Sequence, residues 1–318
     1  MMRALGLLIL SLAALQAAPA QAASADIPWT VLEARYASPA SRFIDLPSGV
    51  RLHYRDEGRC DGPALILLHG FSASLQAWEP WVTRLSGEYR MITLDLPGHG
   101  LTRTPKGYRA SLDANAAIVA DLAERLGVGR FVMVGNSMGG AVAWNLAMLR
   151  PDLLNGLVLV DAAGWPGKGG AGGRPMLAYL IANPLGRAVA GRIDPRPIAA
   201  KGLAMAYLDP ALVTAELIDR YADLARAPGH RGVLVSQRAT PARRVTAQSF
   251  AALRVPTLVM AGEMDRIIPV AQSRAFAEAI PGARLVIYPD GGHVPMEQLP
   301  DQSASDLRAF IQSLKPTP

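Results

Sequence analysis

The chain has 318 residues, of which half are hydrophobic and 18% are charged, so it can bury a substantial core and is not disordered. The formal charge is +6, and the length fits one large domain with an insertion, or two domains. The single cysteine, Cys60, excludes an intrachain disulfide and a cysteine-based metal site, and its turn-like surroundings predict an exposed position.

The first 22 residues have the features of an export signal. A short positive start, Met1–Arg3, precedes an apolar run over 4–15 that is too short for a comfortable membrane span. Small residues stand at the −3 and −1 positions before a predicted cleavage site after Ala22. We therefore expect a cleaved signal peptide and a periplasmic or secreted protein. The alternative is an uncleaved N-terminal membrane anchor.

A hairpin and a series of buried strands are predicted next. The segment 27–37 fits either a helix or an extended linker. Apolar and polar residues alternate over 41–46 and 50–55, around Pro47-Ser48-Gly49, which predicts an antiparallel hairpin. Continuous apolar runs then predict buried parallel strands over 64–68, 89–94, 131–134, 157–161, 257–261 and 284–288.

In the segments between these strands, apolar residues recur at the intervals expected for a helix. Ser111 fits an N-cap and Gly127 fits a stop signal for one of the helices. The predicted helices are 78–85, 112–126, 270–280 and 303–314. Strands that alternate with helices predict an α/β fold, in which a mostly parallel central sheet is covered by helices on both faces. Ligands of such sheets bind at the carboxyl ends of the strands, so polar residues just past those ends are candidate site residues.

The alternation stops between Asp161 and Pro256. A glycine-rich stretch over 164–174 leads into helical pieces near 176–190, 197–207 and 210–225, and the segment 243–253 returns to the main domain. The predicted division of the chain is a signal peptide over 1–22, a first part of the core over 23–162, a helical cap insertion over 163–242 and a second part of the core over 243–318.

One motif stands between a strand and a helix. Gly135-Asn136-Ser137-Met138-Gly139 follows the strand 131–134 and precedes an alanine-rich helical run. A G-x-S-x-G motif in this context places the serine on a strained turn with its hydroxyl exposed at the strand end. Side chains at 135 or 139 would collide with a neighbouring strand or helix. A phosphate cradle is the other use of such a turn, but neither G-x-G-x-x-G nor G-K-[ST] follows the strand. Ser137 is therefore the candidate nucleophile.

Further motifs at strand ends accompany this serine. His69-Gly70-Phe71 follows the strand 64–68, and Asp95-Leu96-Pro97-Gly98-His99-Gly100 follows the strand 89–94. An acid and a histidine follow the last two strands. In this order, the motifs resemble those of the α/β-hydrolase superfamily across roughly residues 41–315, and in particular its serine esterase and lipase-like branch with a helical cap.

The resemblance implies a catalytic triad. A serine hydroxyl needs a base beside it, and the base needs a group that orients it. The superfamily order of serine, acid and histidine makes His293 the base, because it comes last among the histidines. Asp265 stands where the superfamily usually carries its acid, while Glu263 and Asp161 are the alternatives.

The resemblance also implies an oxyanion hole made by the backbone N–H groups of Met138 and Phe71. His69, the loop 95–100 and Glu297 are expected to brace loops near the site. The sequence offers no cluster with metal-ligand spacing, so we expect no metal and no cofactor.

These residues predict a serine hydrolase that acts on small-molecule esters, with an apolar acyl group held between core and cap. The serine argues against dehalogenase and epoxide hydrolase relatives, which use an aspartate nucleophile. Carbon–carbon bond hydrolases of the meta-cleavage type share the elbow over 135–140 and are the main alternative. A cofactor-free perhydrolase or acyltransferase would use the same triad, whereas a non-enzymatic binding protein would be expected to have lost part of it. Acyl length and oligomeric state are left open.

The positive charge of the chain is concentrated in the insertion. Between Gly164 and Arg254 there are thirteen basic and five acidic residues. One interpretation is a solvated arginine-rich surface, and the other is contact with an anionic membrane or an acidic substrate. Aromatic residues do not interleave with these charges as they do in nucleic-acid-binding modules, so nucleic acid is not an expected partner.

If the insertion contacts membranes, binding to lipid vesicles should increase with their anionic lipid content and weaken as salt is added, because salt screens exposed charges. Co-sedimentation with vesicles measures this binding. Binding that responds to neither variable would contradict the membrane interpretation.

Overall fold

Eight strands form one sheet in the computed structural model, which describes residues 25–166, 194–239 and 245–314. The predicted signal peptide and the predicted helical piece at 176–190 lie outside the described residues. The strand order across the sheet is β1-β2-β4-β3-β5-β6-β7-β8. The strands are β1 (Ser41–Asp45), β2 (Arg51–Gly58), β3 (Ala64–Leu68), β4 (Arg90–Leu94), β5 (Phe131–Asn136), β6 (Leu154–Val160), β7 (Thr257–Gly262) and β8 (Arg284–Tyr288).

The sheet is parallel except at one edge. β1 pairs antiparallel with β2, and β2 pairs antiparallel with β4, so the predicted hairpin is confirmed and extends the sheet. All pairings from β4 through β8 are parallel. The carboxyl ends of these parallel strands therefore lie along one edge of the sheet, as the sequence predicts.

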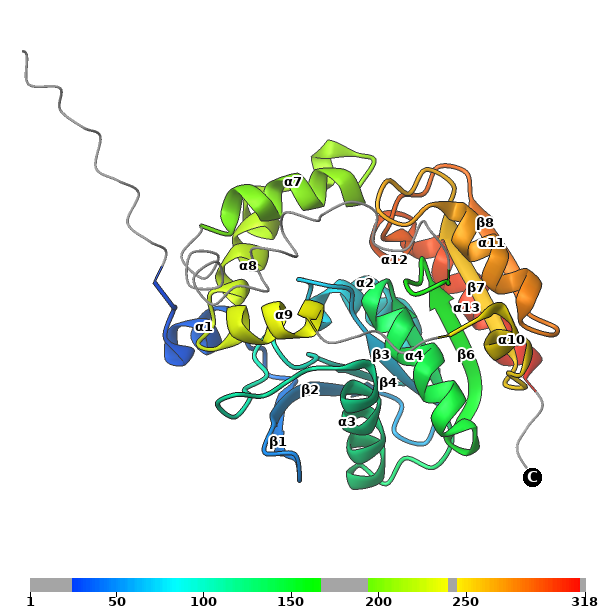
Figure 1. Ribbon diagram of the computed structural model, residues 1–318, viewed down its shortest axis with the longest axis horizontal. Coiled ribbons are helices and arrows are strands. Elements are labelled where there is room, and N and C mark those ends of the chain that lie inside the picture. Colours follow the sequence, from blue (N-terminus) through cyan, green and yellow to red (C-terminus); the bar gives the residue numbers. More distant parts are fainter. Residues whose placement is uncertain (1–24, 167–193, 240–244, 315–318) are drawn as a thin grey trace, which may run out of the picture.

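Each face of the sheet is covered by its own apolar core. Successive side chains of a strand point to opposite faces, so in β3 Ile66 joins one cluster and Leu67 the other. The first cluster includes side chains from α3 (Leu112–Arg125), α4 (Met138–Leu149), α10 (Ala247–Ala251) and α11 (Val270–Ala279). The second includes side chains from α2 (Glu79–Leu85) and α13 (Pro300–Ser313). This arrangement is the predicted α/β fold with helices on both faces (Figure 1).

The boundaries of α3 follow the predicted signals. The Ser111 side chain accepts a hydrogen bond from the backbone N–H of Ala114 at 3.1 Å, which satisfies one of the free N–H groups of the first turn. Gly127, just past the helix, has a φ of 61°, a conformation that glycine adopts without steric cost. The predicted helix at 78–85 is confirmed as α2, which is preceded by a short 3₁₀ turn, η1 (Leu75–Trp78).

Helices of the insertion lie to one side of the sheet, next to α1 (Trp29–Tyr36) (Figure 1). They include α7 (Arg196–Ala206), α8 (Ala215–Ala225) and α9 (His230–Ala239). α7 packs against α8, and α8 packs against α1. The first two match predicted helical pieces, whereas α9 was not predicted because it begins directly after the turn-forming Pro228-Gly229 pair. No helix among the described residues is long and apolar enough to cross a lipid bilayer.

Close contacts between main chains surround the end of β5. A Cβ atom on Gly135 would lie 2.2 Å from the carbonyl oxygen of Gly139, in the following helix. A Cβ atom on Gly139 would lie 2.3 Å from the carbonyl oxygen of Leu68, at the end of β3. Both distances are far inside van der Waals contact, so only glycine fits at either position.

Replacing Gly135 with alanine should therefore lower the free energy of unfolding by about 1–3 kcal/mol or more, because the new methyl group meets backbone atoms that cannot move independently. The control is Gly129→Ala, since a Cβ atom there has no neighbour within 4 Å. Chemical denaturation of the three proteins measures the difference. Equal losses in both variants would show that the close contact at 135 is not the cause.

Candidate active site

Ser137 sits at the turn between β5 and α4, with a φ of 52° and a ψ of −115°. A positive φ is costly for a residue with a side chain, by roughly 1–3 kcal/mol. Backbone hydrogen bonds hold the turn: the Ser137 N–H donates to the carbonyl of Val160, and its own carbonyl accepts from the N–H groups of Ala141 and Ala163. The strained turn expected for a nucleophile elbow is therefore present, and it is fixed by β6 and α4.

His293 and Asp265 lie together, although the sequence separates them by 28 residues. The Nδ1 atom of His293 donates to Oδ2 of Asp265 at 2.6 Å. The other carboxylate oxygen, Oδ1, accepts from the backbone N–H groups of Ile267 and Ile268 at 2.6 and 3.0 Å. The Asp265 side chain is fully buried and that of His293 is 7% exposed. A carboxylate fixed by three donors in this way can orient an imidazole and stabilise its charged form.

The loop that carries His293 is tied to the elbow. The side-chain amide of Asn136, the residue before Ser137, donates to the backbone carbonyl of His293 at 3.0 Å. The backbone N–H of His293 donates to the carbonyl of Ala206, at the end of α7, at 2.9 Å. These bonds hold the histidine loop between the strand that precedes the nucleophile and a helix of the insertion. This role of Asn136 was not predicted, because its partner His293 lies 157 residues further along the chain.

The loop after β3 also reaches the elbow. A Cβ atom on Gly70 would lie 3.3 Å from the Cβ atom of Ser137, so this loop passes directly beside the serine. Phe71 follows Gly70 in this loop, and Met138 is the first residue of α4. Of the two residues expected to supply oxyanion N–H groups, Met138 directly follows Ser137 and Phe71 directly follows Gly70, which lies beside Ser137.

The alternative acids have different surroundings. Glu263 is exposed and pairs with Arg274 at 2.7 Å, whereas the hydrogen bond to His293 comes from Asp265. Asp161, just past β6, is fully buried, and one of its carboxylate oxygens lies within 4.8 Å of Asp265 and His293. Burial and the nearby Asp265 charge raise the pKa of Asp161 well above its usual value.

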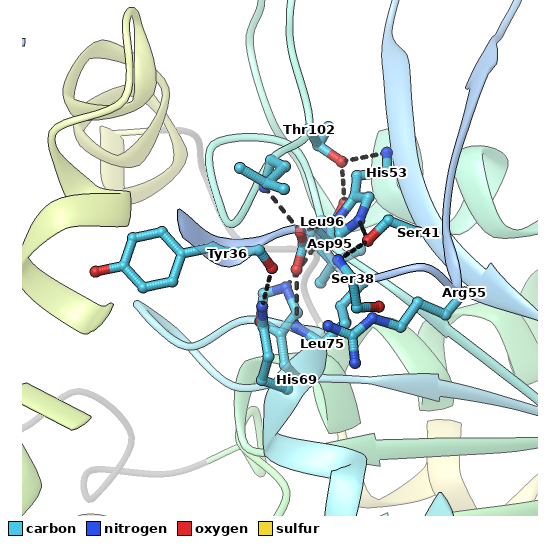
Figure 2. Close-up of polar contacts among 12 residues, drawn as sticks. Tyr36, Ser38, Ser41, His53, Arg55, His69, Leu75, Asp95, Leu96 and Thr102 are labelled. Atoms are coloured by element: carbon cyan, nitrogen blue, oxygen red, sulfur yellow. Dashed lines mark hydrogen bonds and ion pairs between the residues drawn. The ribbon is translucent and has the colours of Figure 1, made fainter. Parts of the chain in front are cut away.

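A second set of serine, histidine and aspartate occurs in the core (Figure 2). Its aspartate, Asp95, begins the predicted loop 95–100. His53 Nδ1 donates to Oδ2 of Asp95 at 2.6 Å, and the Ser41 hydroxyl donates to Nε2 of His53 at 2.8 Å. The connectivity of these three side chains is that of a serine hydrolase triad, so the choice between the two sets depends on their surroundings.

The surroundings of the second set are those of a structural network. Asp95 also accepts backbone N–H groups from Leu75 and Leu101, each at 2.8 Å, which fixes the loops after β3 and β4. His53 and Asp95 are both fully buried. Ser41 lies on the edge strand β1, and its hydroxyl oxygen already accepts the N–H of Ser38. No strand-to-helix turn supports this serine.

His69 braces the same loops, as expected. Its Nε2 atom accepts the backbone N–H of Leu96 at 3.0 Å (Figure 2). Its Nδ1 atom donates to the carbonyl of Gly70 at 2.8 Å. Burial lowers the pKa of the His69 imidazole, so the ring is neutral at neutral pH. A neutral ring with one donor and one acceptor fits both bonds.

Among the described residues, Asp161, Asp265 and His293 form a group whose ligand atoms are close enough to surround a metal ion. The 2.6 Å bond between His293 and Asp265 uses one histidine nitrogen and one carboxylate oxygen of this group. Two carboxyl groups and an imidazole, one pair of which shares such a hydrogen bond, suit a site that takes up and releases protons. The absence of a metal or cofactor site remains a prediction.

A cavity of about 440 Å³ opens between α1, α2 and α8. Three arginines and two glutamates line it, so their charges largely cancel, and none of the predicted site residues takes part. This cavity is therefore not the apolar acyl pocket that the sequence predicts.

Comparison with known proteins agrees with this geometry. The family model for the alpha/beta hydrolase fold matches residues 63–299, which include the elbow, Asp265 and His293. The chain belongs to the α/β-hydrolase fold family.

Several relatives indicate the range of activities in this family. "Lipase 3" of Moraxella sp. (strain TA144) is 29% identical over 279 residues, which cover 86% of this chain and 85% of the lipase. A thermophilic esterase from Thermogutta terrifontis superposes with a TM-score of 0.71 at 28% identity. The superposition covers 87% of this chain and 99% of the esterase chain. A meta-cleavage product hydrolase from Pseudomonas fluorescens IP01 superposes with a TM-score of 0.72 at 25% identity. The superposition covers 86% of this chain and 98% of the hydrolase chain.

Glu297 follows the histidine loop, in α12 (Pro295–Gln298), and its carboxyl group lies in the interior. Burial raises the pKa of this carboxyl to about 7, the charge of Arg220 opposes the rise, and that of Glu79 adds to it. The folded protein therefore binds more protons than the unfolded chain between pH 4.5 and about 7. Its stability falls as the pH rises through this window.

Glu297→Gln should remove this part of the pH dependence, because glutamine does not ionise. Relative to wild type, the variant should gain up to about 3 kcal/mol of stability on going from pH 5 to pH 8. Chemical denaturation at both pH values measures the gain, with the exposed Glu278→Gln as control. Parallel stability curves for the variant and wild type would contradict the burial of an ionisable Glu297.

Proposed function

We propose that the protein is an exported serine hydrolase that cleaves carboxylic esters through an acyl-enzyme on Ser137. The observation that carries this proposal is the 2.6 Å hydrogen bond between His293 and Asp265. The loop of His293 is in turn hydrogen-bonded to Asn136, the residue before Ser137. The export rests on the predicted signal peptide. The lipase and esterase relatives support the choice of ester bonds over other bonds that the family cleaves.

The mechanism follows from the tautomer of His293. Because Nδ1 donates to Asp265, the proton of a neutral ring is on Nδ1 and Nε2 is free to act as a base. Nε2 takes the Ser137 hydroxyl proton as Oγ attacks the ester carbonyl carbon, and then gives that proton to the departing alcohol oxygen. A water molecule then attacks the acyl-enzyme as the same nitrogen takes a proton from it. The bond from the acyl carbon to Oγ breaks, the carboxylic acid is released, and Nε2 returns the proton to Oγ of Ser137.

The developing oxyanion would be held by the backbone N–H groups of Met138 and Phe71, the two positions implied by the family resemblance. Met138 begins α4, so the positive end of the helix dipole adds to the stabilisation of negative charge. Main-chain donors do not reorganise during the reaction, since the glycine contacts around the elbow fix the chain there.

An apolar acyl group is consistent with exposed apolar side chains in the segments that bind His293 and Asp265. Met264 and Ile267 flank Asp265 in sequence and are 51% and 39% exposed. Met205 is 39% exposed and precedes Ala206, which binds the backbone of His293. Exposed apolar side chains in the segments that bind His293 favour a substrate with an apolar portion over a strongly charged one.

A second candidate is carbon–carbon bond hydrolysis of the meta-cleavage type. It is favoured by the elbow Gly135-Asn136-Ser137-Met138-Gly139-Gly140 and by the structural likeness to a meta-cleavage product hydrolase. A perhydrolase or an acyltransferase would use the same three side chains and differ in the acceptor of the acyl group.

The two serine sets of the protein provide a matched test. Ser137→Ala should lower kcat for p-nitrophenyl esters by roughly 10⁴-fold or more, because the acyl-enzyme cannot form. Ser41→Ala should keep kcat within about threefold, since the Ser41 network acts only through structure. Hydrolysis of esters from acetate to palmitate measures both variants and identifies the preferred acyl length.

Loss of activity in the Ser41 variant, with activity retained in the Ser137 variant, would reverse the assignment. A folded wild-type protein that hydrolyses none of these esters would favour the carbon–carbon hydrolase, and a meta-cleavage dienoate is then the substrate to test.

A further inference from the structure

Asp161 is held at the sheet edge that carries the site. It directly follows β6, and its backbone N–H donates to the carbonyl of Met260 in the neighbouring strand β7 at 2.9 Å. Its φ is 43°, a conformation that turns the chain sharply away from the strand. Its Oδ1 atom accepts the backbone N–H of Gly262, at the end of β7, at 3.1 Å. The side chain is therefore fixed between two strand ends.

The position of Asp161 creates an electrostatic conflict with Asp265. One carboxylate oxygen from each aspartate and one ring nitrogen of His293 all lie within 4.8 Å of one another. Both carboxyl side chains are fully buried. Two buried carboxylates this close cannot both be ionised, because their repulsion is not screened by water, so one of them keeps a proton.

The hydrogen bonds decide which aspartate keeps the proton. Asp265 accepts three hydrogen bonds, from two backbone N–H groups and from Nδ1 of His293, and each stabilises its negative charge. Asp161 accepts one, on Oδ1, and its buried Oδ2 atom has no donor among the described residues. The proton therefore belongs on Oδ2 of Asp161. From there, the O–H group can donate a hydrogen bond to the unprotonated Asp265 carboxylate.

The neighbouring titratable groups agree with this assignment. His293 and Asp265 are the groups that share the site with Asp161, and Tyr288 in β8 is close enough for the charge of Asp161 to affect its pKa. The Tyr288 hydroxyl donates to Asp306, and burial raises the pKa of Tyr288, so this tyrosine is neutral. The described residues supply no lysine or arginine pair to Asp161 that would favour its charged form. The pKa of Asp161 is raised by burial first and by the Asp265 charge second.

We propose that Asp161 is a positioning residue of the triad, which remains protonated at neutral pH and donates a hydrogen bond from Oδ2 to the Asp265 carboxylate. The inference rests on the proposed function, since it deepens the role of that site. The site then carries a single negative charge beside His293, and Asp265 is held on one side by backbone N–H groups and on the other by Asp161. No proton is transferred by Asp161 during the reaction.

Two substitutions separate this role from a merely structural one. Asp161→Asn keeps a neutral donor toward Asp265 and an acceptor for the Gly262 N–H, so kcat and KM should stay within about threefold of wild type. Asp161→Leu keeps a similar size but removes the donor, so kcat should fall roughly tenfold or more at unchanged KM. The p-nitrophenyl ester that wild type hydrolyses best serves as the substrate.

The pH profile tests the charge of Asp161 directly. If Asp161 is neutral, Asp161→Asn removes no charge, and the midpoint of the acid limb of kcat/KM should not move. If Asp161 is ionised instead, the same substitution removes a negative charge near His293, and the midpoint should fall by about one pH unit or more. Such a fall, a tenfold loss of kcat in the Asn variant, or an undiminished kcat in a folded Leu variant would overturn the proposal.

An NMR titration keeps this test separate from that of the esterase function. The pH at which the His293 ring gains its proton, followed by ¹H–¹⁵N signals, should be the same in wild type and in Asp161→Asn, whether or not any ester is hydrolysed. If the wild-type protein shows no Ser137-dependent hydrolysis, the proposed function fails while the titration still reports the charge of Asp161. If hydrolysis is normal but the titration shifts, the Asp161 proposal fails alone.

Discussion

The site depends on main chains that approach more closely than any side chain would allow. Gly139 lies against the end of β3, and Gly262 lies so close to the histidine loop that a Cβ atom would be 2.1 Å from the carbonyl oxygen of Gly292. Three strand ends and the loop of His293 are thus packed backbone to backbone. This packing supports the costly positive φ of Ser137, because the surrounding chain leaves no relaxed alternative.

Two sets of serine, histidine and aspartate in one chain show that connectivity alone does not define a catalytic site. Ser41, His53 and Asp95 join a hairpin to the loops behind it, and their hydrogen bonds use every atom that a reaction would need. Ser137 differs in its backbone: it stands at the start of a helix, at the edge where parallel strands end. The strand-to-helix turn, more than the side-chain types, distinguishes the two sets.

The fold was predictable because strand and helix periods are local properties of the sequence. The strand 64–68 and the cap at Ser111 were predicted at their observed positions, since a continuous apolar run and a capping serine need no distant partner. The His293–Asp265 contact was inferred from motif order. The contact between Asp161 and Asp265 was not, because the sequence presented them as rival acids, and only the pairing of β6 with β7 places both beside one histidine. The helix α9 was missed because local turn residues precede it.

Cys60 lies in the turn between β2 and β3, and it is exposed. β3 runs from this turn toward Gly70, beside Ser137, so Cys60 and the elbow are at opposite ends of the same strand. The sequence contains no other cysteine. A thiol-reactive dye or surface linker would consequently attach at one defined point, and an immobilised molecule would present the carboxyl ends of its strands to the solution rather than to the support.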